Sequence, residues 1–196
     1  MTFKLGLTGS IGMGKSTTAE LFMQNGCDVW DADAAVHRLY SAGGRAVEPI
    51  GAEFPDAIVD GEVSRDRLRK IIAENPDALR RIEEIVHPLL SHDRADFVAS
   101  ASNDILVFDI PLLFETGGDA NMDAVVCVTV PEEVQRARVL ERGTMDEAQF
   151  DSIKAKQMPS DEKCKRADYV VETDTLDHAA AQVRAIVNDI RRGRDA

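Results

Sequence analysis

Short apolar runs alternate with amphipathic segments along most of the chain. The apolar runs end at turn residues and predict buried strands over Phe3 to Thr8, Cys27 to Trp30, Ile105 to Asp109, Ala124 to Val130 and Asp168 to Val171. Apolar residues at helical spacing predict helices over Lys15 to Gln24, Ala34 to Tyr40, Pro131 to about Arg142, about Met145 to Gln157, and Leu176 to Arg192. This alternation predicts an α/β fold in which a five-stranded parallel sheet carries helices on both faces.

The pattern changes between Arg45 and Asn103, where strand signals almost vanish and helical patterns follow one another. Ser64 predicts the N-cap of a helix over Arg65 to Glu74, and Pro76 opens a helix through Val86. His87-Pro88 then predicts the start of a separate amphipathic helix through Ser100. Because the strand pattern resumes directly afterwards, we interpret this region as a helical insertion rather than a second domain.

A glycine-rich loop follows the first predicted strand and has the pattern Gly-x-x-x-x-Gly-Lys-Ser, with a helix opening at its end. Glycines let the backbone approach a phosphate closely, and the loop and helix N–H groups then surround the anion. A lysine can reach the β- and γ-phosphates, and a serine hydroxyl can bind Mg²⁺. The alternative is a turn that binds nothing. The predicted nucleotide-binding residues are Gly9, Ser10, Ile11, Gly12, Met13, Gly14, Lys15, Ser16 and Thr17.

Two acids, Asp31 and Asp33, follow the second predicted strand. Their spacing would place both side chains on the same side of an extended segment. In phosphoryl transfer a carboxylate can orient the acceptor hydroxyl and accept its proton. Helix capping is the alternative, since acids are common at that position.

Asp109 ends the third apolar run and fits the acid that holds Mg²⁺ directly or through water. A buried aspartate without a metal role is the alternative. The residues after it do not form Asp-x-x-Gly, and the chain has no Asn/Thr-Lys-x-Asp motif for guanine. The sequence therefore does not support a GTP switch, and ATP is the expected nucleotide.

Basic residues gather on two consecutive predicted helices. Arg138 and Arg142 share a helix face with four-residue spacing, and they could neutralise charge on a transferred phosphate. Arg136, Lys154 and Lys156 lie nearby, and ordinary surface ion pairs with glutamates are the alternative.

The chain has 196 residues and a net charge of −12, which argues against a general nucleic-acid surface. No segment resembles a membrane span or signal peptide, so we expect a cytoplasmic protein without membrane partners, as a monomer or small homo-oligomer. Cys27, Cys127 and Cys164 have no paired spacing, so neither a disulfide framework nor a zinc site is indicated. Burial is the expected role of two of them.

Together these motifs make the chain similar to the dephospho-CoA kinase family over almost its whole length. The matching stretches are Leu7 to Ser16, Asp31-Ala32-Asp33, His87-Pro88, Pro111-Leu112-Leu113-Phe114-Glu115, and Gln157 through Glu162-Lys163 to Ala167-Asp168-Tyr169-Val170. Many nucleotide-binding proteins share the loop, but this combination in this order is specific.

The resemblance implies a P-loop NTPase fold that transfers the γ-phosphate of ATP to the ribose 3′-hydroxyl of dephospho-CoA, the last step of coenzyme A synthesis, with Mg²⁺ as cofactor. It divides the chain into a core (1–33, 104–140 and 166–196), an acceptor-binding helical insertion (34–103) and a lid (141–165). It implies Asp33 as catalytic base, with Lys15, Arg138 and Arg142 acting on the phosphates and Ser16 and Asp109 at the metal. Residues implied near the acceptor are Asp31, Asp33, His87, Pro111, Leu113 and Glu115.

Two stretches depart from the family pattern. Arg142-Gly143 stands where the family often has Arg-Asp, and Glu172-Thr173-Asp174 replaces an asparagine-containing turn beside the adenine. Two other functions remain open: a nucleoside or nucleotide kinase with the same core, and a regulatory nucleotide-binding module without an acceptor.

Overall fold

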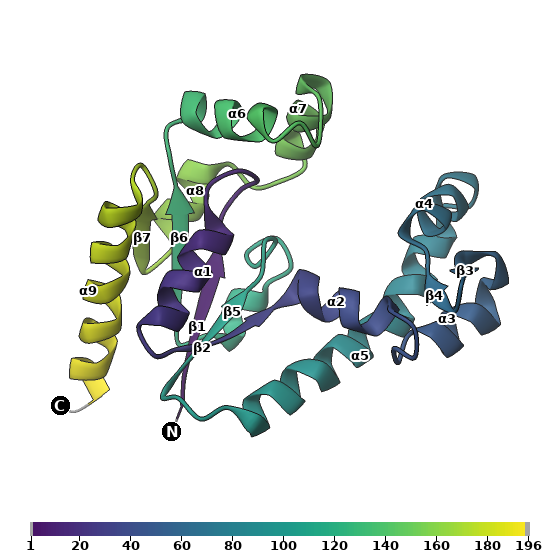
Figure 1. Ribbon diagram of the computed structural model, residues 1–196, viewed down its shortest axis with the longest axis horizontal. Helices are drawn as coiled ribbons and strands as arrows, with labels where there is room; N and C mark the ends of the chain where they lie inside the picture. Colours follow the sequence, from purple (N-terminus) through teal and green to yellow (C-terminus); the bar gives the residue numbers. More distant parts are fainter. Residues whose placement is uncertain (1, 195–196) are drawn as a thin grey trace. The chain divides into compact units, whose positions relative to one another are not determined.

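A computed structural model describes residues 2–194, and its contacts divide the chain into two compact units. The first, here called the sheet unit, runs to Trp30 and resumes at Ala101; the second, the helical unit, is Asp31–Ser100. Five strands form the sheet in the order β2-β5-β1-β6-β7, which confirms the predicted α/β fold (Figure 1). Their bounds are β1 Phe3–Thr8, β2 Asp28–Asp31, β5 Ile105–Asp109, β6 Ala124–Thr129 and β7 Tyr169–Glu172.

The register brings functional strand ends to one edge of the sheet. β1 is central and pairs in parallel with β5, where Leu7 is opposite Asp109, and with β6, where Thr8 is opposite Cys127. The glycine loop that follows β1 therefore begins beside the carboxyl end of β5. This is the edge at which ligands bind in open α/β sheets.

Alternate residues of the central strands pack on opposite faces, so both faces of the sheet are buried. Leu5 and Leu7 join the larger apolar cluster, whereas a Cβ placed on Gly6 would be 2.6 Å from Leu113 Cδ2 on the other face. On β6, Val126 belongs to the larger cluster and Val125 packs with Leu113. Such two-sided burial explains why these strands read as continuous apolar runs.

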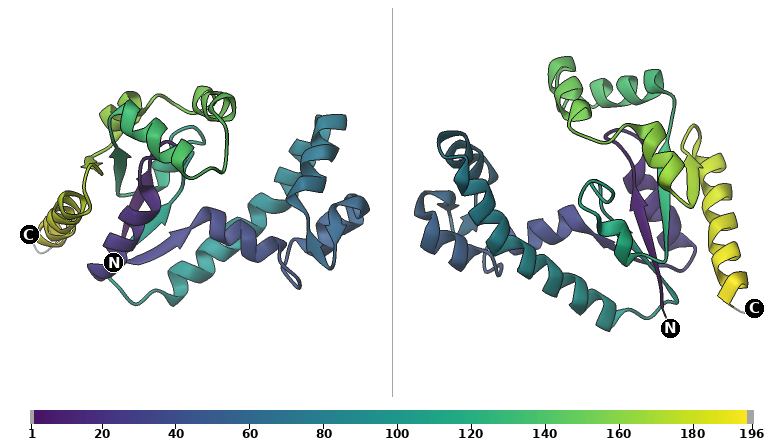
Figure 2. Two further views of the ribbon diagram at one scale, coloured as in Figure 1. Left: turned by 45° about the horizontal axis from the view of Figure 1, so that its top comes forward. Right: turned by 180° about the vertical axis from the view of Figure 1, so that it is seen from behind.

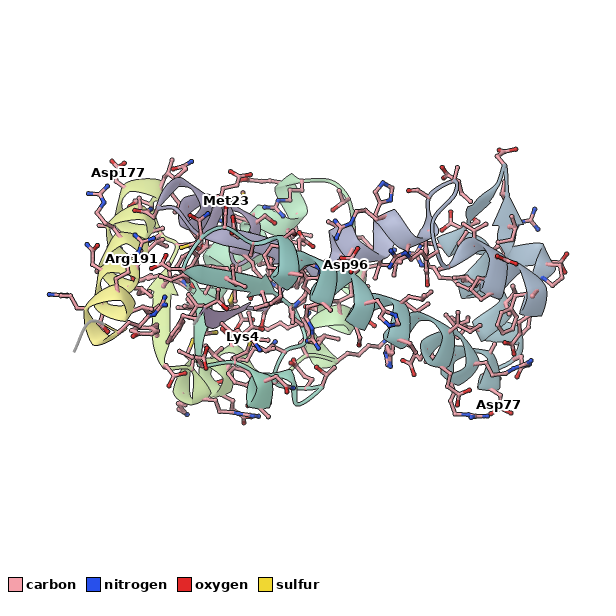
Figure 3. All side chains as sticks on the ribbon, turned by 90° about the horizontal axis from the view of Figure 1, so that it is seen from below. Lys4, Met23, Asp77, Asp96, Asp177 and Arg191 are labelled. Carbon is pink, nitrogen blue, oxygen red and sulfur yellow. The ribbon has the colours of Figure 1, made fainter. Side chains whose placement is uncertain are left out.

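Helices cover both faces. α1 (Lys15–Gln24) and α9 (Leu176–Arg194) contact each other over the larger cluster, and α8 (Ser160–Arg166) packs on β6 from the opposite face (Figure 2). Arg191 of α9, labelled in Figure 3, donates hydrogen bonds to the carbonyls of Asn25 and Gly26 at the end of α1, at 3.4 and 3.2 Å. It also forms a 3.1 Å ion pair with Asp104, whose pKa is lowered mainly by this hydrogen bonding.

In the chain, α6 (Glu132–Glu141) and α7 (Glu147–Ala155) follow β6 and precede α8, and the two helices contact each other. Arg136 of α6 pairs with Glu147 and with Asp151, 3.1 Å away, on α7. For Arg136 the surface-pair alternative is thus confirmed. A short 3₁₀ helix, η2 (Gly118–Asn121), precedes β6.

The helical unit has its own apolar core, formed by residues such as Leu39, Ile50, Leu68 and Ile82. Its elements are α2 Ala32–Tyr40, α3 Val47–Glu53, η1 Pro55–Ala57, β3 Ile58–Val59, β4 Glu62–Val63, α4 Arg65–Glu74 and α5 Asp77–Ser100. No helix in the described part of the chain is long and apolar enough to span a membrane.

The predicted break at His87-Pro88 is wrong, because α5 is one helix with Pro88 inside it. Proline removes one backbone hydrogen bond and disfavours a helix interior. The apolar face nevertheless continues across it: Val86 on one side and Leu89 and Leu90 on the other pack in the same cluster. The Arg38–Asp93 pair at 2.6 Å ties the second half of α5 to α2. Tertiary packing thus outweighs the local preference.

Besides the short 3₁₀ helices η1 and η2, the sequence analysis does not predict four elements: α3, β3, β4 and α8. α3 and the hairpin β3-β4 lie in the region 45–103, where the sequence has almost no strand signal, and α8 lies between two predicted elements. The hairpin turn is Asp60-Gly61, with φ of 51° and 80°. Asp-Gly with positive φ at both positions is a strong two-residue hairpin signal. The strand runs beside it are only two residues each, which is why the periodicity did not reveal them.

Candidate phosphate-transfer site

The glycine loop has the conformation that its sequence requires. Gly14 is the N-cap of α1 with φ 84°, and no side chain among the described residues caps it. The N–H groups of the first helical turn therefore point toward the loop without an intrahelical acceptor. At Gly9 a Cβ would come within 2.3 Å of Val128 Cγ2 and 3.1 Å of Val128 O. A larger residue at Gly9 would force the loop away from β6.

Side chains from distant segments hold the backbone of the loop. The amide of Gln157 accepts from Ile11 N at 3.2 Å, and the amide of Gln135 donates to Ile11 O at 2.7 Å. Thr173 Oγ1 donates to Met13 O at 2.8 Å. The peptide groups of Ile11 and Met13 are thus fixed from outside the loop. Sequence reasoning missed Gln135 and Thr173 as supports, and the burial of both polar side chains is the structural signal that finds them.

Lys15 and Asp109 form an ion pair at the strand ends. Asp109 is 1% exposed and Lys15 is 16% exposed on its side chain. The register explains the pairing, since Asp109 ends β5 beside β1 and Lys15 begins α1 after the loop. A buried carboxylate requires such a partner. The pair brings together a predicted phosphate ligand and a predicted metal ligand.

Asp31 and Asp33 do not lie in an extended segment. Asp31 is the last residue of β2 and the N-cap of α2, where its Oδ1 accepts from Ala34 N at 2.9 Å. The expectation that both acids project to one side of a strand is therefore wrong, because the helix begins at Ala32. The capping alternative holds for Asp31. Asp33 is exposed in the first turn of α2, and its role as base stays a prediction.

The segment after β5 is fixed by a buried lysine. Lys163 of α8 is fully buried and donates to Pro111 O at 2.9 Å, and it forms a 2.9 Å ion pair with Glu115. Burial raises the pKa of Glu115, but hydrogen bonds from Lys163 and from Met158 N more than offset this, so the pKa lies below its ordinary value of 4.5. Leu113 is 0% exposed and packs with Val125 in the core. Leu113 can therefore serve an acceptor only by shaping this segment.

Of the two candidate arginines, Arg138 is anchored and Arg142 is exposed. Arg138 donates to Thr173 O at 2.6 Å and to Thr173 Oγ1 at 3.1 Å. It thereby links α6 to the turn after β7, the same turn that departs from the family pattern. Arg142 is the C-cap of α6, and its contact with a phosphate stays a prediction.

A cavity of about 400 Å³ adjoins the loop. Its walls come from the loop, α6, α7 and the connection to α8, and the lining residues are Ser10, Met13, Gln135, Asp151, Lys154, Ala155, Gln157, Met158, Pro159 and Ser160. Seven of these ten, all but Ser10, Met13 and Gln135, fall in the segment 141–165, the predicted lid. The loop and the predicted lid therefore share one cavity within the sheet unit.

The helical unit has a separate cavity of about 350 Å³, lined largely by apolar side chains. His87, predicted to lie near the acceptor, is among its lining residues, on α5. Arg65 and Arg69 of α4 also line it. The cavity thus combines an apolar wall with two guanidinium groups, an imidazole and the carboxylate of Glu83, so that its charged groups carry a net positive charge and suit a ligand with an apolar chain and anionic groups.

No group of three or more histidines, cysteines or acids that could hold a metal exists among the described residues. Mg²⁺ in nucleotide enzymes is usually bound by one or two protein oxygens together with phosphates and water. The exposed hydroxyl-bearing Ser16 and the carboxylate of Asp109 supply such oxygens. This donor set fits Mg²⁺ brought in with a nucleotide.

A parallel sheet whose first strand leads through Gly-x-x-x-x-Gly-Lys-Ser into a helix defines a P-loop nucleotide-binding protein. The sequence profile described as "Dephospho-CoA kinase" matches residues 3–178. The chain belongs to the dephospho-CoA kinase family.

Individual relatives agree with this assignment. A dephospho-CoA kinase from Ruegeria pomeroyi is 69% identical over 98% of both chains. Among solved structures, TT1252 from Thermus thermophilus has 30% identity and a TM-score of 0.85 over 96% of this chain and 97% of its own. A dephospho-CoA kinase from Campylobacter jejuni, at 22% identity and a TM-score of 0.70 over 99% of this chain and 100% of its own, supports the fold.

Proposed function

We propose that the protein transfers the γ-phosphate of ATP to the 3′-hydroxyl of dephospho-CoA, with the glycine loop as the triphosphate site. The observation that carries this proposal is the loop itself, held by Gln157, Gln135 and Thr173 beside the Lys15–Asp109 pair. Loop N–H groups and the Lys15 ammonium neutralise the phosphates, so that charge developing on the transferred group is stabilised without reorganisation.

Asp33 is proposed as the base that orients the acceptor hydroxyl and accepts its proton. It is exposed and lies in the first turn of α2, and the cap of that helix is supplied by Asp31 instead. Asp33 is therefore free of the capping role that explains Asp31. The chemistry requires its carboxylate within hydrogen-bond reach of the hydroxyl when both substrates are bound.

Ser16 and Asp109 would hold Mg²⁺, which supplies charge neutralisation at the β- and γ-phosphate oxygens when bound. We also propose that Arg138 of α6 and Arg142, at the start of segment 141–165, neutralise charge on the phosphates. The cytoplasmic location and the monomeric or small oligomeric state stay predictions.

The cavity of the helical unit is proposed to receive the acceptor. Its volume of about 350 Å³ falls in the range of small-molecule sites. Its apolar side chains suit a flexible arm, and Arg65 and Arg69 outnumber the one lining carboxylate, that of Glu83, which suits phosphates. The family resemblance implies that the insertion 34–103 binds the acceptor, and this cavity supports that role.

An acceptor screen with γ-labelled ATP and Mg²⁺ tests the proposed function. Dephospho-CoA, several nucleoside monophosphates and water compete as acceptors in the same reaction, with Lys15→Ala as the blank. We expect label on dephospho-CoA and none on the monophosphates. Label on a monophosphate alone would assign a nucleotide kinase, and label only in inorganic phosphate would assign a module without an acceptor.

A further inference from the structure

We propose that Cys127 and Cys164 are a redox-active pair that forms a reversible intramolecular disulfide when the protein meets a peroxide. Their Sγ atoms are 3.6 Å apart, at hydrogen-bonding distance for two thiols. Cys127 lies in β6 and Cys164 in α8. The proposal does not depend on the proposed function, because it concerns thiols that the phosphoryl transfer does not use.

The fold holds the two sulfurs in place. Along β6 the side chains alternate, and Val126 and Val128 join the cluster beneath α1 and α9. Cys127 therefore faces the opposite side, where α8 packs on β6. A disulfide has an S–S length near 2.0 Å, so the sulfurs must approach by about 1.5 Å. Both thiols are free, and Cys164 lies on the short helix α8, so the approach involves a side-chain rotation or a shift of that helix.

The two thiols have different reactivity. Cys164 is partly exposed, and its pKa is lowered to about 6, first by the hydrogen bond with Cys127 and then by hydrogen bonds with Thr129 and Ser160, against the effects of burial and Asp161. Cys127 is fully buried, and its pKa is raised by the same hydrogen bond and by burial, with Glu115 adding to the shift and Lys163 opposing it. Thiolates are the reactive form, so Cys164 attacks and Cys127 resolves.

The chemistry balances with a peroxide as oxidant. The Cys164 thiolate attacks one peroxide oxygen and becomes a sulfenic acid, while the peroxide O–O bond breaks and its other oxygen leaves as water after taking a proton. The Cys127 sulfur then attacks the Cys164 sulfur, and the sulfenic oxygen leaves as a second water with the Cys127 proton. Two electrons pass from the thiols to the peroxide. A dithiol reductant then converts the disulfide back to the two cysteine thiols by thiol–disulfide exchange, and the reductant is itself oxidised to a disulfide.

The third cysteine provides an internal comparison. Cys27 is only 4% exposed and lies in the apolar cluster on the other face of the sheet. Burial raises its pKa to about 11. It has no sulfur partner among the hydrogen bonds of the described residues. Cys27 should therefore remain a thiol at peroxide concentrations that oxidise the other two.

The test is a titration of the native, full-length protein with hydrogen peroxide near pH 7. Free thiols are then alkylated after denaturation, and peptides are analysed without reduction. We expect Cys127 and Cys164 to disappear from the alkylated pool together, in one linked peptide pair, and to return on treatment with dithiothreitol. Cys27→Ser should behave as the wild type does.

Two variants separate the steps. Cys164→Ser should keep Cys127 reduced, and Cys127→Ser should accumulate a sulfenic acid at Cys164 that dimedone traps. The proposal is overturned if wild-type Cys164 proceeds to sulfinic acid while Cys127 stays alkylatable. It is also overturned if Cys27 is oxidised as fast as Cys164, or if the linked peptides join separate chains. The wild-type result decides the question even if a variant does not fold.

Discussion

The two units differ in what they bury. In the sheet unit several polar side chains are buried, whereas the buried residues of the helical unit are all apolar. The buried polar residues are Thr8, Ser10, Thr18, Asp109, Gln135, Lys163 and Thr173. None of the buried side-chain nitrogen or oxygen atoms in the described residues lacks a hydrogen-bond partner.

This difference indicates two ways of binding a ligand. A fully satisfied polar network is rigid and fixes donors in place, which suits the triphosphate. An apolar cavity such as that of the helical unit binds by burial and tolerates small changes in shape. Substitutions in the sheet unit should therefore have large effects on chemistry or folding, and substitutions around the helical cavity should have smaller effects on acceptor affinity.

Lys15→Ala should have the largest effect. It removes the cation from the loop, and turnover should fall by on the order of a thousandfold. It also removes the lysine that pairs with the buried carboxylate of Asp109, so the free energy of unfolding should fall by about 3 kcal/mol. Steady-state kinetics and urea unfolding measure the two effects. Lys70→Ala, at an exposed lysine of the helical unit, is the control. An equal loss of turnover and stability in Lys70→Ala would contradict the role assigned to Lys15.

Lys163→Met should destabilise the sheet unit by about 3 kcal/mol, because it removes the cation that pairs with the partly buried carboxylate of Glu115 and one of the donors to Pro111 O, where Thr8 Oγ1 also donates. Lys165→Met is a matched control on the same helix, since Lys165 is 76% exposed on its side chain. Thermal unfolding distinguishes the two variants. Similar melting temperatures for both would contradict the role assigned to Lys163.

The Lys163–Glu115 ion pair predicts that the free energy of unfolding depends on pH. The pKa of Glu115 is lower in the folded protein than its ordinary value of 4.5, so its contribution to stability is present above that pH. The contribution is lost as the pH falls through the lower, folded value. Urea unfolding of wild type and Glu115→Gln between pH 7 and 3 should show the variant losing less stability on acidification. Parallel curves would contradict this assignment.

His87→Ala should raise KM for the acceptor by about tenfold and leave KM for ATP unchanged, since one lining contact of the helical cavity is lost. His92→Ala is the control, because His92 is exposed on the same helix and does not line the cavity. A change in KM for ATP instead would assign His87 to the nucleotide.

Asp31→Ala should have the smallest effect. Loss of the N-cap of α2 should reduce the free energy of unfolding by about 1 kcal/mol, and Asp31→Asn should restore most of it because asparagine caps equally well. A large loss of turnover in Asp31→Asn with unchanged stability would show that Asp31 acts in the chemistry as well.

The sequence predicts the sheet, the loop and most helices, because long apolar runs and the glycine spacing report local requirements directly. It does not predict the continuity of α5 across Pro88, which depends on packing shared by both halves of the helix. The hairpin at Asp60-Gly61 carried a turn signal but had strands too short for periodicity. The supports of the loop, Gln135 and Gln157, lie more than a hundred residues from Ile11, and no local pattern reveals such contacts.

The most direct test of the account is the turnover of Asp33→Asn under saturating ATP, Mg²⁺ and dephospho-CoA. The control is Asp77→Asn, which changes another exposed acid in the first turn of a helix of the same unit. We predict that Asp33→Asn lowers kcat by on the order of a hundredfold while ATP binding and thermal stability stay unchanged, and that Asp77→Asn changes none of them. Near-normal kcat in Asp33→Asn would contradict the assignment of this carboxylate as the base.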